Sequence, residues 1–241
     1  MAKRGSVKDL LERTKNGEAL AASRLMSKIQ WDNKTAKRMV SKLTLPDKTL
    51  LIGVTGSGGV GKSTLINKLI HYFLKEQKSI GILCCDPVSI SDGSFLGDRI
   101  RMQEHAGKEQ VFIRSLTQRQ NFKGASPEIS YLIKIFGAMG KDVIIVETVG
   151  SGQENLGFRE QVRALIYVTS PDIGDEIQLF KGGVIETADI IVLNRSDSPK
   201  ADQAFQDLTT HFGQSKKLYK VNSLNGDGFP ELMQGIKEVK F

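Results

Sequence analysis

Short apolar runs alternate with amphipathic stretches from residue 49 to the end of the chain. The runs are rich in β-branched residues and predict strands over residues 50–55, 80–85, 110–115, 143–148, 164–169, 190–194 and 218–222. Helical periodicity is clearest between them over residues 62–75, 128–139, 200–211 and 230–239. Several strands are apolar on both faces, as is typical of a parallel sheet covered by helices. The pattern therefore predicts an α/β fold with a mostly parallel sheet.

The first 48 residues have a helical pattern of their own. Ser6 followed by Asp9 resembles a capping box, and apolar positions recur at helical spacing as far as Leu43. Asp32 is predicted to cap a third short helix, and Pro46 ends the region. We therefore divide the chain into a helical N-terminal extension over residues 1–48 and an α/β domain over residues 49–241.

Composition and charge narrow the class of protein. With 39% apolar and 25% charged residues among 241, the chain is globular rather than disordered or fibrous. No apolar run approaches the roughly 20 residues of a membrane helix, so we expect no membrane partner. Two cysteines, Cys84 and Cys85, are too few for a disulfide framework or a four-ligand zinc site, which favours the reducing cytoplasm.

The net charge of +7 is unevenly distributed along the chain. Residues 1–50 contain 12 Lys and Arg against 5 Asp and Glu, whereas the remaining residues are balanced at 22 of each sign. A basic helical region can meet nucleic acid or an acidic protein face. Because Trp31 is its one aromatic residue, a solvated helix face is the favoured interpretation and a nucleic-acid partner is not favoured.

The strongest chemical signal is the segment Gly56-Ser57-Gly58-Gly59-Val60-Gly61-Lys62-Ser63, which fits the P-loop pattern G-x-x-x-x-G-K-[ST]. It lies between a predicted strand and a predicted helix. Its glycines allow a tight turn whose N–H groups face phosphate oxygens, and the helix adds its positive N-terminal end. Lys62 is expected to reach the terminal phosphates, and the Ser63 hydroxyl to bind Mg²⁺. We therefore predict a nucleoside triphosphate site over residues 56–64, Thr64 included.

A second element, Asn194-Arg195-Ser196-Asp197, follows a late predicted strand and approximates the N-K-x-D motif with which GTPases read guanine. A carboxylate at Asp197 would accept hydrogen bonds from guanine N1–H and from the N2 amino group, whereas adenine has neither donor there. An ordinary turn is the common alternative for N-x-x-D alone. Its position after the P-loop favours guanine, with Asn194, Arg195 and Asp197 as binding residues.

Carboxylates that end predicted strands are candidates for the magnesium site. Glu147 ends an apolar strand, and Gly150, three residues later, can direct its N–H at the γ-phosphate. Asp86, at the end of another strand, and Asp98 are two further candidates. For each carboxylate taken singly, a helix cap or a surface ion pair is the alternative.

Together these residues resemble the MeaB/ArgK-type GTPases, the G-protein chaperones of methylmalonyl-CoA mutase and related cobalamin-dependent mutases. The resemblance runs from about Gly17 to the C-terminus. Beyond the P-loop and N-x-x-D, it rests on Cys85-Asp86-Pro87, Leu96-Gly97-Asp98-Arg99-Ile100-Arg101-Met102, Phe112-Ile113-Arg114-Ser115, Glu147-Thr148-Val149-Gly150 with Gln153, Gly174-Asp175-Glu176 with Gln178 and Lys181, and Ala188-Asp189-Ile190. The run over residues 96–102 is the most specific of these segments.

The resemblance implies a GTPase that binds GTP, GDP and Mg²⁺, that is slow on its own, and that gates cofactor loading or protection of a cobalamin-dependent acyl-CoA mutase. It implies that Asp86, Asp98 and Glu147 organise Mg²⁺, with Glu147 and Gln153 acting in catalysis beside Lys62. It places Asn222, Ser223 and Leu224 at the guanine base. It also implies that a third loop couples the GTPase to the mutase through Asp175, Glu176 and Lys181.

The sequence also departs from this family at several positions. Arg195 stands where the motif has Lys, and Asp172 follows Pro171 where the family has Gly. Relatives dimerise through a C-terminal helical arm that we expect this sequence, which ends at Phe241, to lack, so the resemblance leaves a homodimer open. Two alternatives also stay open: a P-loop kinase or ATPase acting on a small molecule, and a nucleotide-binding regulatory module with little hydrolysis.

Overall fold

The computed structural model describes residues 5–87, 108–118, 127–148, 159, 161–172 and 184–239. Within these residues, seven strands form one sheet in the order β3-β2-β4-β1-β5-β6-β7, and every neighbouring pair is parallel. The strands are β1 (Leu50–Thr55), β2 (Ile80–Pro87), β3 (Val111–Gln118), β4 (Val143–Glu147), β5 (Ala164–Thr169), β6 (Ile190–Leu193) and β7 (Lys217–Lys220). The order reverses around β1, so the carboxyl end of β1 lies between those of β4 and β5. In open α/β sheets, ligands bind at such a reversal.

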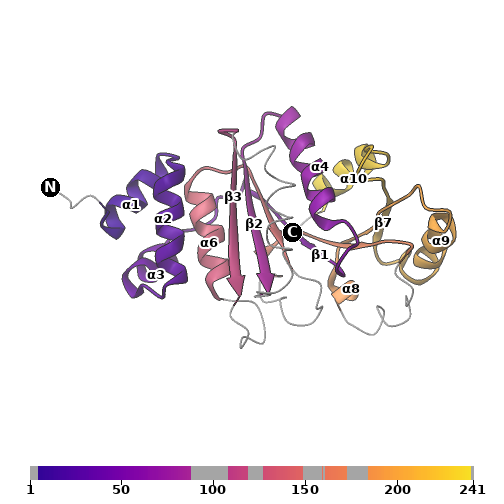
Figure 1. The fold of residues 1–241 in the computed structure, drawn as a ribbon, viewed down its shortest axis with the longest axis horizontal. Coiled ribbons are helices and arrows are strands. Elements are labelled where there is room, and N and C mark those ends of the chain that lie inside the picture. The colour runs from indigo at the N-terminus through magenta and orange to yellow at the C-terminus, as the bar shows by residue number, and fades with distance from the viewer. Residues whose placement is uncertain are drawn as a thin grey trace.

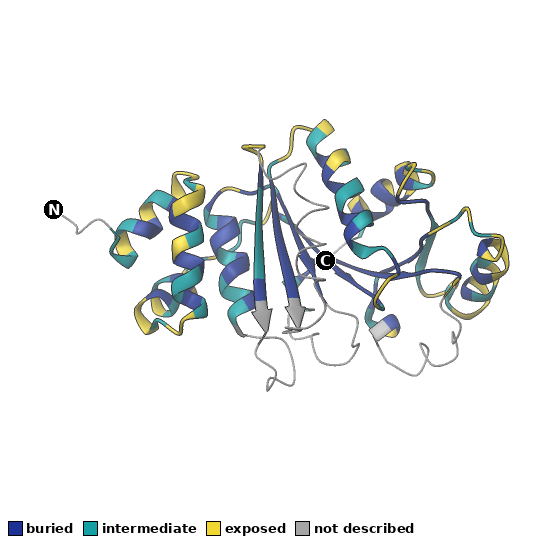
Figure 2. Cartoon of the chain, in the orientation of Figure 1, coloured by how far each residue is buried: buried dark blue, intermediate teal, exposed yellow. Residues whose placement is uncertain are grey.

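Helices cover both faces of the sheet. The described helices are α1 (Val7–Lys15), α2 (Ala19–Gln30), α3 (Lys34–Ser41), α4 (Lys62–Lys75), α6 (Pro127–Ala138), α8 (Val184–Thr187), α9 (Ala201–Phe212) and α10 (Phe229–Lys237). One apolar cluster joins α4 and α10 to one face, and a second joins α6, α8 and α9 to the other. Buried residues therefore occupy the strands and the helix faces turned toward them (Figure 2).

Neighbouring strand residues alternate between these two clusters. Leu51 belongs to the cluster with α6, whereas Ile52 and Val54 belong to the cluster with α4. Side chains of successive strand residues point to opposite faces, so a strand buried on both faces must be apolar at every position. This accounts for the continuous apolar runs and confirms the α/β fold expected from them.

The three N-terminal helices pack on one end of the α/β layers, beside α6 (Figure 1). They share the apolar cluster of α6 through fully buried side chains: Leu10, Ala21, Ala22, Leu25, Met26, Ile29, Ala36 and Val40. The Arg114 guanidinium on β3 donates hydrogen bonds to Ser23, Ser27 and Gln30 of α2. The basic extension therefore packs its apolar face against α6 and is hydrogen-bonded to β3, the edge strand of the sheet.

Several element boundaries match the sequence-based prediction, whereas others differ from it by one to three residues, as at the C-terminal ends of β2 and β3. Helix α4 and strands β1 and β5 begin and end at the predicted residues, and Ser6 caps α1 by accepting a hydrogen bond from Asp9 N–H at 3.1 Å. The predicted cap of α3 was wrong by one residue. Asn33, not Asp32, caps that helix, because Asn33 has extended backbone and accepts from Ala36 N–H at 2.9 Å. Asp32 instead has a left-handed φ of 59°.

None of the helices in the described part of the chain has the length and apolarity required to cross a membrane.

Candidate functional site

The P-loop connects β1 to α4 at the reversal of strand order. Two of its glycines have left-handed backbone in places where a side chain would collide with a neighbour. A Cβ at Gly56, whose φ is 140°, would lie 2.1 Å from the Val168 carbonyl oxygen, and one at Gly61 would lie 2.4 Å from Asn194 Nδ2. Contact with β5 and with the residue after β6 therefore requires glycine at both positions.

The Lys62 ammonium is held over the P-loop. It donates hydrogen bonds to the carbonyl oxygens of Gly56 at 2.9 Å and Ser57 at 2.8 Å. Lys62 is the first residue of α4, whose N-cap Gly61 contributes no side chain and whose first turn contains no acidic residue. The start of this 14-residue helix thus combines a positive dipole end with an ammonium group, which favours anions.

The Ser57 side chain lies close to Tyr167 of β5. Burial raises the pKa of Tyr167 above its ordinary value, and the interaction of its hydroxyl with the Ser57 side chain acts in the opposite direction. Tyr167 therefore stays a neutral phenol at physiological pH. This contact ties the first turn of the P-loop to the strand beside it, and sequence reasoning missed it because no local pattern links a strand tyrosine to a loop serine.

Ser63, in the first turn of α4, lies beside Glu147, the last residue of β4. The Ser63 hydroxyl donates to Glu147 Oε1 at 3.0 Å, and both residues are buried. Thr148 N–H donates to the Val54 carbonyl at 2.9 Å, which fixes the chain just after Glu147. A hydroxyl and a carboxylate are hard oxygen donors of the kind that Mg²⁺ binds, usually together with waters and phosphate oxygens. The pair therefore fits a magnesium site that phosphates complete.

Asn194 joins the P-loop to the segment after β7. Its amide nitrogen donates to the Val60 carbonyl at 2.9 Å, and its amide oxygen accepts from Ser223 N–H at 3.1 Å and Ser223 Oγ at 2.8 Å. Asn194 and Ser223 are both buried. Because this one side chain bridges two separate segments, it sets the distance between the phosphate loop and the predicted base site.

Asp197 and Asn222 form the other half of the predicted base site. Asn222 Nδ2 donates to Asp197 Oδ1 at 2.9 Å, while Asn222 Oδ1 accepts from Leu224 N–H at 2.9 Å. Asn222 is buried, whereas Asp197 is exposed and Leu224 retains 79% of its exposure. A carboxylate held in place beside an exposed apolar side chain can accept from the edge of a guanine and contact the face of its ring.

The remaining predicted residues are only partly described. Asp86 is the second-to-last residue of β2, the neighbour of β4, and its side chain lies outside the described part of the structure. Six others lie wholly outside the described residues: Asp98, Gly150, Gln153, Asp175, Glu176 and Lys181. The described part of the predicted site thus comprises the P-loop, Glu147 and the segments after β6 and β7.

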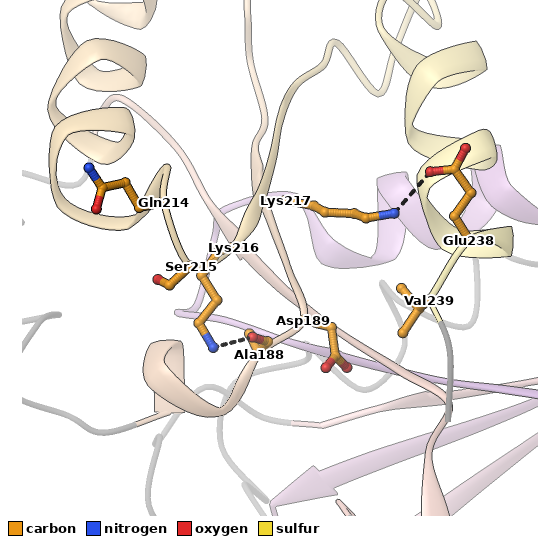
Figure 3. A pocket seen from close by; sticks show the side chains of 8 residues that line it. All are labelled: Ala188, Asp189, Gln214, Ser215, Lys216, Lys217, Glu238 and Val239. Carbon is orange, nitrogen blue, oxygen red and sulfur yellow. Dashed lines mark hydrogen bonds and ion pairs between the residues drawn. The ribbon is translucent and has the colours of Figure 1, made fainter.

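A shallow pocket at the opposite edge of the sheet is a weaker candidate (Figure 3). It lies between the start of β6, the loop before β7 and the end of α10. Its charged groups already have partners within the protein: Lys217 pairs with Glu238 at 3.0 Å, Asp189 with Arg159 at 2.6 Å, and Lys216 donates to the Ala188 carbonyl at 2.7 Å. These contacts hold neighbouring elements together, so the pocket is a structural junction rather than a binding site.

Comparison with known proteins agrees with the geometry at the carboxyl edge of the sheet. A family model described as "Methylmalonyl Co-A mutase-associated GTPase MeaB" matches residues 22–240. A protein of Pyrococcus horikoshii is 37% identical over 246 residues, which cover 97% of this chain and 78% of that protein. The fused isobutyryl-CoA mutase of Geobacillus kaustophilus is 32% identical over 225 residues, which cover 88% of this chain and 21% of the fused protein.

A solved structure has the same fold. The crystal structure of a protein titled "LAO/AO transport system kinase" superposes with a TM-score of 0.77 at 22% identity and covers 99% of this chain and 76% of its own. At that identity the likeness concerns the fold, an all-parallel P-loop NTPase sheet covered by helices. The family model spans most of the chain, so the conclusion about membership rests on sequence. The chain belongs to the MeaB family of P-loop GTPases.

Proposed function

We propose that this GTPase is a chaperone of a cobalamin-dependent acyl-CoA mutase and gates the loading or protection of the mutase's cofactor. The observation that carries the proposal is the fused isobutyryl-CoA mutase, because 88% of this chain aligns within a single polypeptide named for mutase activity. The family description, which names a mutase association, agrees with it. We place this activity in the cytoplasm, in keeping with the thiols of Cys84 and Cys85.

GTP would lie along the carboxyl edge of the sheet, with its phosphates on the P-loop and its base beside Asp197. Phosphate oxygens would replace the Gly56 and Ser57 carbonyls as partners of Lys62. Asp197 would accept from guanine N1–H and from the N2 amino group. The Ser223 N–H, aligned by Asn194, lies in the segment assigned to guanine O6.

Ser63 and Glu147 would hold Mg²⁺, with Asp86 and Asp98 as the further proposed carboxylates. The metal would neutralise charge that develops on the β- and γ-phosphates. The Ser63 hydroxyl donates a hydrogen bond to Glu147, and it can rotate to present a lone pair to the metal instead.

Hydrolysis would proceed by in-line attack of water on the γ-phosphate. Lys62 would stabilise the negative charge on the transferred group and on the β-phosphate oxygen that leaves, and Gln153 is the proposed water-positioning residue. Arginine fingers raise GTPase rates by about 10³–10⁵, and none is assigned within this chain. We therefore expect unassisted turnover of roughly 10⁻⁴–10⁻² per second. Asp175, Glu176 and Lys181 are proposed to transmit the nucleotide state to the mutase.

Single-turnover GTP hydrolysis with and without a purified cobalamin-dependent acyl-CoA mutase tests the proposal. We expect the mutase to raise the hydrolysis rate at least tenfold, and GTP and GDP to change the rate at which the mutase takes up its cofactor. The Lys62→Ala variant is the control for contaminating GTPases. Unchanged hydrolysis and unchanged cofactor uptake across acyl-CoA mutases of this class would refute the chaperone role while leaving the GTPase assignment intact.

A further inference from the structure

The Arg195 guanidinium connects two segments at the carboxyl edge of the sheet. Its Nη2 donates to the carbonyl oxygen of Gly59 in the P-loop at 2.8 Å, and its Nη1 pairs with Asp172 Oδ2 at 2.9 Å. Asp172 follows β5 and Arg195 follows β6, and these strands are parallel neighbours. One side chain thus spans from the phosphate loop to the segment after β5.

Asp172 is itself oriented from two sides. Its second carboxylate oxygen, Oδ1, accepts from Ser198 Oγ at 3.3 Å while Oδ2 faces Arg195. The hydrogen bond and charge of the guanidinium hold the pKa of Asp172 below its ordinary value. Asp172 therefore remains a carboxylate at physiological pH and supplies a fixed negative partner for Arg195.

Arg195 also has a backbone that requires support. Its φ of 59° is left-handed, which is unfavourable for a residue with a long side chain. Backbone pairing on both sides keeps this turn in place: Asn194 N–H donates to the Thr169 carbonyl at 2.9 Å and Ser196 N–H to the Val221 carbonyl at 3.0 Å. The turn sends the Arg195 side chain back toward the P-loop, and the two guanidinium contacts fix its far end.

We propose that Asp172 is a positioning residue for nucleotide retention. It holds the Arg195 guanidinium in a fixed position, where the guanidinium covers the base site. This inference rests on the proposed guanine-nucleotide site and identifies a residue outside the motifs that define it. A planar guanidinium with two anchored nitrogens can cover the face of a purine, and anchoring lowers the conformational entropy that binding would otherwise cost. Without Asp172, Arg195 keeps only its contact with Gly59 and opens more readily.

The expected effect is moderate because both partners are half exposed. Their side chains each retain 48% of their exposure. Exposed ion pairs have small coupling energies, so loss of this one should accelerate nucleotide release by about two- to fivefold. The effect should appear in the dissociation rate, since Asp172 holds a group that is proposed to cover bound nucleotide.

Release of a fluorescent GDP analogue, measured by stopped flow with excess GDP as chaser, tests the inference. Asp172→Ala should accelerate release by about two- to fivefold, and Asp172→Glu should restore most of the wild-type rate. In the Arg195→Ala background, Asp172→Ala should add nothing, because the group that it positions is gone. The matched control is Asp202→Ala, which removes the exposed carboxylate that pairs with Lys220 and should leave the release rate unchanged.

Three results would overturn the inference: an unchanged rate in Asp172→Ala, no recovery in Asp172→Glu, or additive effects of Asp172→Ala and Arg195→Ala. Failure of the wild type to bind the GDP analogue would instead refute the guanine-nucleotide site itself. Binding by the wild type with an unchanged release rate in Asp172→Ala would refute the role of Asp172 alone.

Discussion

Removal of the Asn194 side chain should break the hydrogen-bonded connection between the phosphate loop and the base site. It is buried and makes three hydrogen bonds, one to the Val60 carbonyl and two from Ser223. The Asn194→Ala variant would leave all three partner groups without this bridge in a buried place. Unlike a surface amide, the lost side chain cannot be replaced freely by solvent.

The cost follows from the number and burial of these contacts. Each hydrogen bond contributes about 1 kcal/mol net, and buried groups left unpaired raise the cost, so the free energy of unfolding should fall by about 2–4 kcal/mol. The dissociation constant for GDP should rise at least tenfold, which corresponds to about 1.4 kcal/mol. Asn194→Asp should be nearly as damaging, because a carboxylate cannot donate to the Val60 carbonyl and places like charge beside it.

Urea denaturation and GDP titration calorimetry measure both quantities. Asn225→Ala is the control, since Asn225 is an exposed amide in the segment after β7 that contains Ser223, and its loss should change the free energy of unfolding by less than about 0.5 kcal/mol. If Asn194→Ala stayed within 1 kcal/mol of the wild type and bound GDP with equal affinity, the bridging role assigned to Asn194 would be wrong.

Three further predictions concern separate parts of the molecule. Gly56→Ala should abolish nucleotide binding, because its Cβ would lie 2.1 Å from the Val168 carbonyl oxygen. The control Gly58→Ala should still bind nucleotide, because the space around its Cβ is open. Equal nucleotide binding by the two variants would contradict the packing argument. Asp197→Asn should shift preference from guanine toward xanthine nucleotides, because an amide can donate to the 2-oxo group; competition titrations with GDP and XDP check this. Asp142 accepts hydrogen bonds from Ser79 N–H and Oγ, which lower the pKa of its carboxyl below the ordinary 3.8. Its stabilisation is therefore present above pH 3.8 and lost as pH falls through the lowered pKa, so Asp142→Asn should reduce the free energy of unfolding by about 1–2 kcal/mol at pH 7 and by much less near pH 2.

The sequence predicted most of the fold because the central strands β1, β4, β5 and β6 are buried on both faces. Continuous apolar runs such as that of β5 leave little ambiguity, and the P-loop fixes the boundary between β1 and α4. The helix α8, only four residues long, escaped prediction because one turn carries no periodic signal. Asp32 and Asn33 are both good caps by residue type, so only the backbone conformation could choose between them.

The candidate site was predictable as motifs but not as contacts. Asn194, Asp197 and Ser223 were assigned to the base separately, whereas the hydrogen bonds among Asn194, Ser223 and the P-loop depend on strand order. Arg195 and Asp172 were two unrelated departures from the family pattern in the sequence. They are ion-pair partners because β5 and β6 are adjacent, which a pattern of local residues does not encode.

Hydrolysis of GTP by the purified chain, with ATP as competitor, tests the central claim most directly. Phosphate release from GTP should be slow, should require Mg²⁺, should be lost in Lys62→Ala, and should persist in a hundredfold excess of ATP. Inhibition of GTP hydrolysis by an equal concentration of ATP, or hydrolysis at the wild-type rate by Lys62→Ala, would contradict the assignment of this site to guanine nucleotides.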